Sequence, residues 1–248
     1  MKRILAFGAT LVAFTLPVAA CGEKAGGGNG TGAAASPSPS PSPKPAEVLA
    51  KAAAATEGKN LKFTLKFEGE TADCVHDATS KGTSITAGTG DEKFEFLFFP
   101  GTIYMKNILT SGKFFKIDMS KVKATSDFRV LEDPLFARSF LATATDVKAD
   151  AAGAYSGTLD LTKVTGAAKQ AADVLAKDAG AKATAIPFTA TVDAQGRLAS
   201  FTTTFPGADD GKDMPWELKI QEIGGTATVA QPAPSTVTEF PASEYDDL

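Results

Sequence analysis

The strongest constraint on the fold is an alternation of apolar and polar side chains that recurs along the chain. It is clearest at residues 63–67, and it returns at 94–98, 115–119 and 186–192. Because successive side chains of a strand point to opposite faces of a sheet, each stretch predicts a strand with one apolar and one polar face. A chain with several such strands is expected to bury one face of a sheet.

Turn residues between these stretches predict that neighbouring strands are antiparallel. Glycine marks breaks at Gly82 and Gly101, and residues 193–196 are expected to join the strands 186–192 and 197–205 as a hairpin. Short connections of this kind join strands that lie side by side and run in opposite directions.

Less regular stretches complete the strand prediction. Residues 71–77 form a polar strand, residues 216–220 an alternating one, and residues 226–229 a last short one before a proline-broken end. The acidic tail at 243–248 is expected to be solvated.

Three segments have helical character. Residues 46–55 carry apolar side chains at helical spacing and stop before Gly58. A second helix is expected to open at Asp133, with proline as its first residue, and a third covers the alanine-rich residues 166–177. An antiparallel sheet with helices against one face is an α+β fold.

The start of the chain predicts a cleavable signal peptide. Lys2 and Arg3 precede the uncharged apolar segment 4–16. Its length suits a signal of roughly 7–15 apolar residues and falls short of the roughly 17–25 needed to span a bilayer.

The signal ends in a motif that fits a lipobox. Val18 supplies the aliphatic residue, Ala19 and Ala20 the small residues, and Cys21 a thiol that can carry diacylglycerol and, after cleavage, an N-acyl group. The mature chain is therefore expected to begin at Cys21. It should be anchored by its lipid to the extracytoplasmic face of the cell membrane.

A linker separates this predicted anchor from the folded domain. Residues 21–45 are rich in Gly, Ala, Ser and Pro, and the Ser-Pro repeat at 36–45 should extend over about 30 Å. The chain thus divides into a signal peptide (1–20), a lipidated cysteine with its linker (21–45) and one domain (46–248).

Charge and cysteine content exclude several classes of function. Loss of Lys2 and Arg3 takes the formal net charge from −4 to −6, and no basic cluster follows, which argues against nucleic-acid binding. If Cys21 is acylated, Cys74 has no partner for a disulfide. The domain must then be stabilised by an apolar core, and it is expected to be a monomer.

No catalytic or metal-binding pattern stands out, so the chain is not expected to be an enzyme and needs no cofactor. Cys74 and His76 lie two residues apart on a predicted strand, roughly 6.5–7 Å from each other, which is too far for a thiol–imidazole pair. One thiol and one imidazole cannot hold zinc. The acidic residues at 209–213 lack the spacing of a calcium loop and favour a solvated hairpin.

The order of elements resembles the LppX/LprG-type lipoproteins of actinobacteria, whose fold is similar to LolA and LolB. The resemblance is carried by the initial helix, the strand motifs at 101–106 and 114–118, the Asp133 turn and the motif at 155–160. It implies a strongly curved antiparallel sheet, a half-barrel wrapped around helices. It also implies an apolar cavity that holds acyl chains of lipids or glycolipids for transfer or presentation.

The candidate cavity-lining side chains are large and apolar and sit on the predicted strand faces and helices. They are Phe63, Leu65, Phe67, Phe94, Phe96, Phe98, Phe115, Ile117, Phe136, Phe140, Ile186, Phe188, Phe201 and Trp216. Periodicity does not distinguish a lined cavity from a filled core. The alternative is a protein-interaction module on a stalk, with a solid core, no ligand and a protein partner that the sequence does not identify.

Overall fold

A computed structural model describes residues 43–248, except residues 68, 89, 91–92, 108–109, 125, 127, 130–132, 134, 151 and 247. The described residues belong to one compact unit, Ser42–Leu248. The predicted signal peptide, the predicted lipobox with Cys21 and most of the predicted linker lie outside the described residues. Among the residues described, no helix combines the length and the apolar character needed to cross a membrane.

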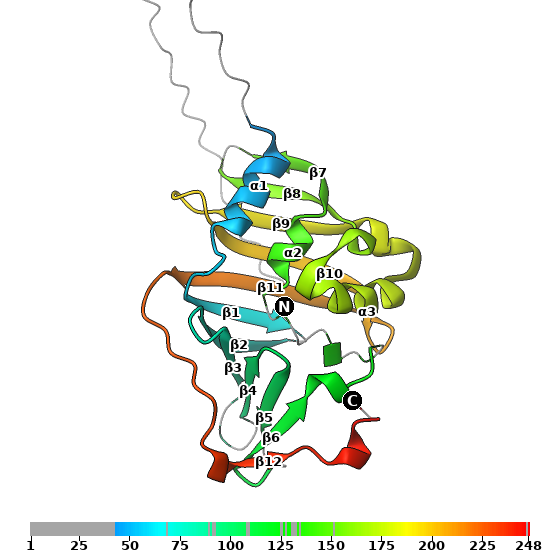
Figure 1. Cartoon of the computed structure of the whole chain (residues 1–248). Helices are drawn as coiled ribbons and strands as arrows, with labels where there is room; N and C mark the ends of the chain where they lie inside the picture. Colours follow the sequence, from blue (N-terminus) through cyan, green and yellow to red (C-terminus); the bar gives the residue numbers. More distant parts are fainter. Residues whose placement is uncertain are drawn as a thin grey trace, which may run out of the picture. The chain divides into compact units, whose positions relative to one another are not determined.

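Twelve strands form one large, curved and unclosed sheet, which confirms the predicted α+β class (Figure 1). Its order is β12-β6-β5-β4-β3-β2-β1-β11-β10-β9-β8-β7, and each neighbouring pair is antiparallel except β12 with β6. The strands are β1 (Leu61–Phe67), β2 (Glu70–Asp77), β3 (Gly82–Ala87), β4 (Phe94–Phe99), β5 (Thr102–Lys106), β6 (Phe114–Asp118), β7 (Ala144–Ala149), β8 (Ala154–Leu159), β9 (Ile186–Val192), β10 (Leu198–Asp209), β11 (Lys212–Ile223) and β12 (Val237–Glu239).

Two meanders meet in the middle of this sheet. Strands β1–β6 follow one another outward to one edge, and β7–β11 return from the opposite edge until β11 pairs with β1. In that pairing Leu65 lies opposite Leu218 and Phe67 opposite Trp216. Side chains directly opposite each other share a face of the sheet, so the two meanders share one apolar inner face.

Three α-helices lie against the β7–β11 half of the sheet (Figure 1). Helix α1 contacts β7, β10 and α2, and α3 contacts β10. The helical segments are α1 (Pro45–Ala54), η3 (Met119–Lys121), α2 (Ala137–Leu141), η5 (Leu161–Lys163), η6 (Gly166–Ala168), α3 (Lys169–Ala179), η7 (Gly180–Thr184), η8 (Pro234–Thr236) and η9 (Ala242–Glu244).

The predicted helices are confirmed, with shifted ends. Helix α1 starts at Pro45, whose fixed φ suits a first turn, and Gly58 follows it at φ +61°. Asp133 does cap a turn, since its carboxylate accepts from the Leu135 N–H at 3.0 Å, but α2 itself begins only at Ala137. The third helix, α3, ends at Ala179, two residues beyond its predicted end.

An aromatic cluster joins α2 to the two long strands beneath it. Phe136 lies 4.7 Å from Phe140 and 4.5 Å from Trp216 between ring centroids, and Phe140 lies 6.0 Å from Phe205. Phe201 extends the cluster along β10, 5.8 Å from Trp216. Rings at these separations pack closely and gain some favourable energy beyond the area that they bury.

Two predictions about hairpins are confirmed. Strands β9 and β10 form the expected pair, and the Asp193 carboxylate in their turn accepts from the N–H groups of Gln195 and Arg197, both at 2.9 Å. The acidic stretch at 209–213 forms the tight connection between β10 and β11, with Asp210 at φ +46°.

The predicted strand at 226–229 is wrong, because this segment pairs with no strand and instead crosses the outer face of the sheet. Val229 packs into a small outer cluster with Leu97, Tyr104 and Phe114. Its N–H donates to the Asp77 carboxylate at 3.3 Å. Burial on the sheet and this one hydrogen bond hold the segment extended without a ladder of its own.

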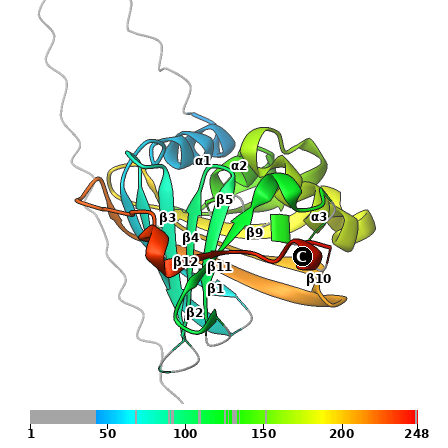
Figure 2. The same cartoon turned by 60° about the horizontal axis from the view of Figure 1, so that its bottom comes forward.

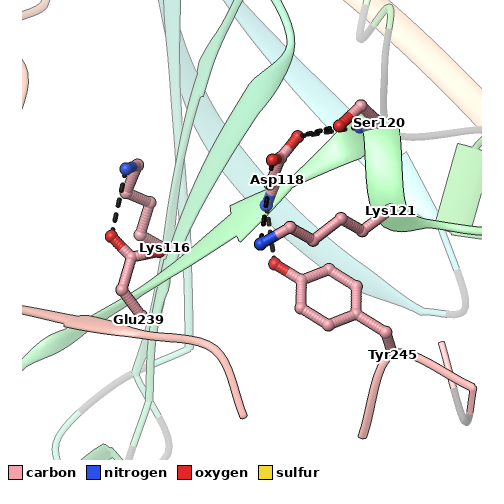
Figure 3. Close-up of polar contacts among 6 residues, drawn as sticks. All are labelled: Lys116, Asp118, Ser120, Lys121, Glu239 and Tyr245. Carbon is pink, nitrogen blue, oxygen red and sulfur yellow. Dashed lines mark hydrogen bonds and ion pairs between the residues drawn. The ribbon is translucent and has the colours of Figure 1, made fainter. Parts of the chain in front are cut away.

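The expectation of a solvated acidic tail holds for its charged side chains, because Glu244 and Asp246 are exposed, but the tail also packs against the domain. The end of the chain follows β12 along the β6 edge (Figure 2), and the Tyr245 side chain is buried in the main core. Figure 3 shows the Tyr245 hydroxyl accepting from the Asp118 N–H at 2.9 Å, with Lys116 paired to Glu239 at 3.0 Å. Phe240 adds an edge contact to the Phe115 ring at 5.9 Å. The tail is thus part of the folded domain.

Candidate ligand pocket

A pocket of about 590 Å³ opens at the end of the inner face, beside the turns β2–β3 and β4–β5. Its volume falls within the roughly 300–1,000 Å³ of small-molecule sites. The described residues that line it are Gly58, His76, Ala78, Lys81, Thr83, Phe98, Phe99, Pro100, Gly101, Ile103, Met119, Asp133, Leu135 and Arg138.

Four neighbouring strands build the floor of this pocket. His76, Thr83, Phe98 and Ile103 lie directly opposite one another in the registers of β2, β3, β4 and β5, so their side chains share the inner face. His76 Nδ1 and Thr83 Oγ1 are 2.9 Å apart. The floor is therefore apolar at Phe98 and Ile103 and polar at the other end of the row.

The opposite wall comes from the chain between β6 and α2 and from the first turn of α2. Met119 and Leu135 supply buried apolar side chains, and Asp133 and Arg138 supply charge. Burial raises the pKa of the Asp133 carboxyl above its usual value, while the positive charge of Arg138 and the Leu135 N–H oppose that rise. The pocket thus combines an apolar interior with a few polar groups, as small-molecule sites do.

The charge of Arg138 acts on both His76 and Asp133. Burial, and next the Arg138 charge, lower the pKa of His76, so this imidazole is mostly neutral near pH 7. The pocket wall carries two basic side chains, Lys81 and Arg138, and one acidic side chain, Asp133. Within the described part of the chain, no side chain or carbonyl accepts a hydrogen bond from the Arg138 guanidinium.

The structure places the fourteen predicted cavity residues in three environments. Of the fourteen, only Phe98 is among the described residues that line this pocket. Nine are buried in the main core: Phe63, Leu65, Ile117, Phe136, Phe140, Ile186, Phe188, Phe201 and Trp216. Four are half-buried: Phe67, Phe94, Phe96 and Phe115. Contact of the last thirteen with a ligand stays a prediction.

Several pocket residues gave no signal in the sequence. The sequence did not single out Arg138 or Lys81, and Met119 was predicted as a strand residue. Asp133 was recognised only as a helix cap. One feature of the sequence could have indicated the site. Asp133 and Arg138 lie close in sequence to the apolar residues Phe136 and Phe140, so a charged pair adjoins an apolar helix segment.

Cys74 is a buried core residue. It lies in β2 on the same face as His76, and its Sγ donates weakly to the Ala72 carbonyl at 3.7 Å, whereas the imidazole bonds to Thr83. Burial is the largest cause that raises the pKa of the thiol to about 12. A thiol in this environment stays protonated and is a poor nucleophile.

The Cys74 thiol should therefore resist alkylation while the domain is folded. In the mature chain with Cys21→Ser, where Cys74 is the only thiol, labelling at pH 8 should be about a thousandfold slower than in guanidinium, because the thiolate fraction falls by that factor between pKa values of 9.0 and about 12. Following reagent colour with time measures both rates. Equal rates in the two states would contradict the burial of this side chain.

Within the described residues, no group of three or more His, Cys, Asp or Glu side chains is placed to hold a metal ion.

Comparisons with known proteins give similarity to solved structures only. No protein family and no curated protein sequence matches the chain. Among solved structures, it is similar to a crystal structure of MucB in complex with MucA(peri), with a TM-score of 0.34 and 16% identity. The alignment covers 77% of this chain and 58% of the MucB chain, so it spans less than two thirds of that protein. A similarity of this strength establishes neither a family nor a function.

Proposed function

We propose that the protein is an extracytoplasmic lipoprotein, anchored through Cys21, whose domain binds the acyl chain of a lipid or glycolipid in the pocket. The observation that carries this proposal is the pocket itself, in which apolar side chains of the floor and the wall adjoin polar and charged groups. The lipobox and the resemblance to LppX/LprG-type lipoproteins support it from the sequence.

The energetics suit reversible binding. Each methylene transferred from water to an apolar site contributes about 0.8 kcal/mol, so ten methylenes contribute about 8 kcal/mol. Association costs about 4–15 kcal/mol in lost freedom, which is of the same size, so burial of the chain alone gives weak binding at most. A carrier that must also release its ligand needs affinity of this kind, and the proposed role requires no catalytic group.

One observation favours the alternative of a protein-interaction module. Phe94 and Phe96 are half-buried on the inner face of β4, with ring centroids 5.7 Å apart. Exposed aromatic rings in a row suit an apolar partner surface as well as a lipid. A protein partner would then cover the inner face, and no small ligand would be present.

Native mass spectrometry separates the two possibilities. The mature chain with Cys21→Ser, which lacks the acyl chains of the anchor itself, should carry lipid-sized adducts that disappear after solvent extraction. Ala78→Phe places a ring at the mouth of the pocket, so it should reduce these adducts severalfold.

Thr79→Phe is the matched control, because Thr79 is the exposed next residue of the same turn and is not among the described residues that line the pocket. Absence of adducts from the parent chain, or equal adducts in all three proteins, would argue against ligand binding in this pocket.

A further inference from the structure

The Arg138 guanidinium is an unused donor at the centre of the candidate pocket. It lies half-buried on the first turn of α2, close enough to Asp133 and His76 to shift the pKa of both. No ion pair or hydrogen bond engages it among the residues that the structure describes. A guanidinium has five N–H donors in a planar fork, so the pocket holds donors that only a ligand or water can satisfy.

The charge around Arg138 favours an anion. Lys81 adds a second positive charge at the exposed rim of the pocket, and Asp133 contributes the one carboxyl. One oxygen of that carboxyl is already engaged by the Leu135 N–H. With His76 mostly neutral near pH 7, positive charge exceeds negative charge on the pocket wall.

We infer that the pocket takes a single-chain amphiphile with an anionic head, a carboxylate or a phosphate, which the Arg138 guanidinium holds while the chain lies against Phe98, Ile103, Met119 and Leu135. This inference rests on the proposed function and specifies the ligand class. Guanidinium binds carboxylate and phosphate oxygens in a bidentate manner, which a neutral glyceride cannot match. Partial burial strengthens the pairing, because the effective dielectric there is lower than in water.

Three probes that share one acyl chain test the role of the head: oleate, oleoyl lysophosphatidate and neutral monoolein. Binding to the mature Cys21→Ser chain is measured by calorimetry below the concentrations at which the probes form micelles. At least one anion should bind about tenfold or more tightly than monoolein, since a hydrogen bond to a charged group contributes about 1.5–3 kcal/mol. The better of the two anions identifies the head as carboxylate or phosphate.

Substitutions of Arg138 locate the effect. Arg138→Gln should weaken anion binding about tenfold to a hundredfold and leave monoolein unchanged, whereas Arg138→Lys, which keeps the charge, should retain part of the preference. Arg197→Gln is the control: Arg197 belongs to the β9–β10 turn, where it pairs with Asp193 at 2.7 Å, and this variant should bind all three probes as the parent does.

Equal binding of the three probes, unchanged by Arg138→Gln, would overturn the anionic head and leave acyl-chain binding intact. Equal weakening of all three probes in both Arg138 variants would also overturn it, because the arginine would then only support the structure. Failure of every probe to bind would overturn the proposed function together with this inference.

Discussion

Replacement of Phe140 by alanine should lower the free energy of unfolding by about 3–5 kcal/mol, the cost of deleting a fully buried phenylalanine ring. Phe140 is 0% exposed and contacts the rings of Phe136 and Phe205. Its loss would open a cavity between α2 and β10, because the surrounding structure relaxes only partly around a deleted ring. Denaturant unfolding followed by far-UV circular dichroism measures the change.

Phe94→Ala is the appropriate control for this variant. Phe94 carries the same side chain, but its ring is half-exposed at the far end of the β4 inner face, so its truncation should cost much less. If the two variants lost equal free energy of unfolding, the aromatic cluster beneath α2 would contribute no more to stability than the half-exposed Phe94 ring does.

Replacement of Cys21 by serine should move the protein from the membrane fraction to the soluble fraction almost completely. Serine cannot form the thioether to diacylglycerol, and the remaining chain offers no basic cluster that could hold it on an anionic surface. Fractionation with immunoblotting measures the distribution. The intact mass should fall by the mass of the acyl groups.

Cys74→Ala serves as the matched control for the other cysteine, and this variant should stay in the membrane fraction. A Cys21→Ser protein that still partitions with the membrane would refute lipid anchoring at that residue.

The sequence allowed prediction of the strands whose two faces differ in polarity. β1 and β9 alternate large apolar residues with polar ones. The predicted ends of both strands lie within a few residues of the observed ends. β7 and β8 were missed as alternating strands, because residues such as Ala144, Thr145 and Asp146 carry little apolar contrast. β12 has only three residues, too few for any periodicity to appear.

Long-range pairing and the end of the chain could not be predicted. Nothing local in 61–67 indicates that its partner is Lys212–Ile223, since the register depends on which apolar faces meet in the folded sheet. The tail looked solvated because four of its last six residues are Ser or acidic. The side chains of Glu244 and Asp246 are indeed exposed, but Tyr245 between them inserts its ring into the core and its hydroxyl against the Asp118 N–H.

The pocket escaped prediction for a related reason. Periodicity indicates which side chains face inward, but it does not show where packing stops short of filling the space. Phe98 was predicted to face a cavity and does line this one, whereas Phe63 faces the same side and is fully packed. The charged groups were hidden in the sequence because a single arginine after a helix cap is usual on protein surfaces.

Because β1 pairs with β11, the sheet cannot be completed until a strand late in the chain has formed. Phe67 and Trp216 are neighbours across the seam although 149 positions separate them in the sequence. Such distant partners close a large loop and slow the search for the native state, and until β11 is available the β1 edge stays open to wrong partners. The two halves of the domain therefore become one sheet only after the last long strand, β11, is in place.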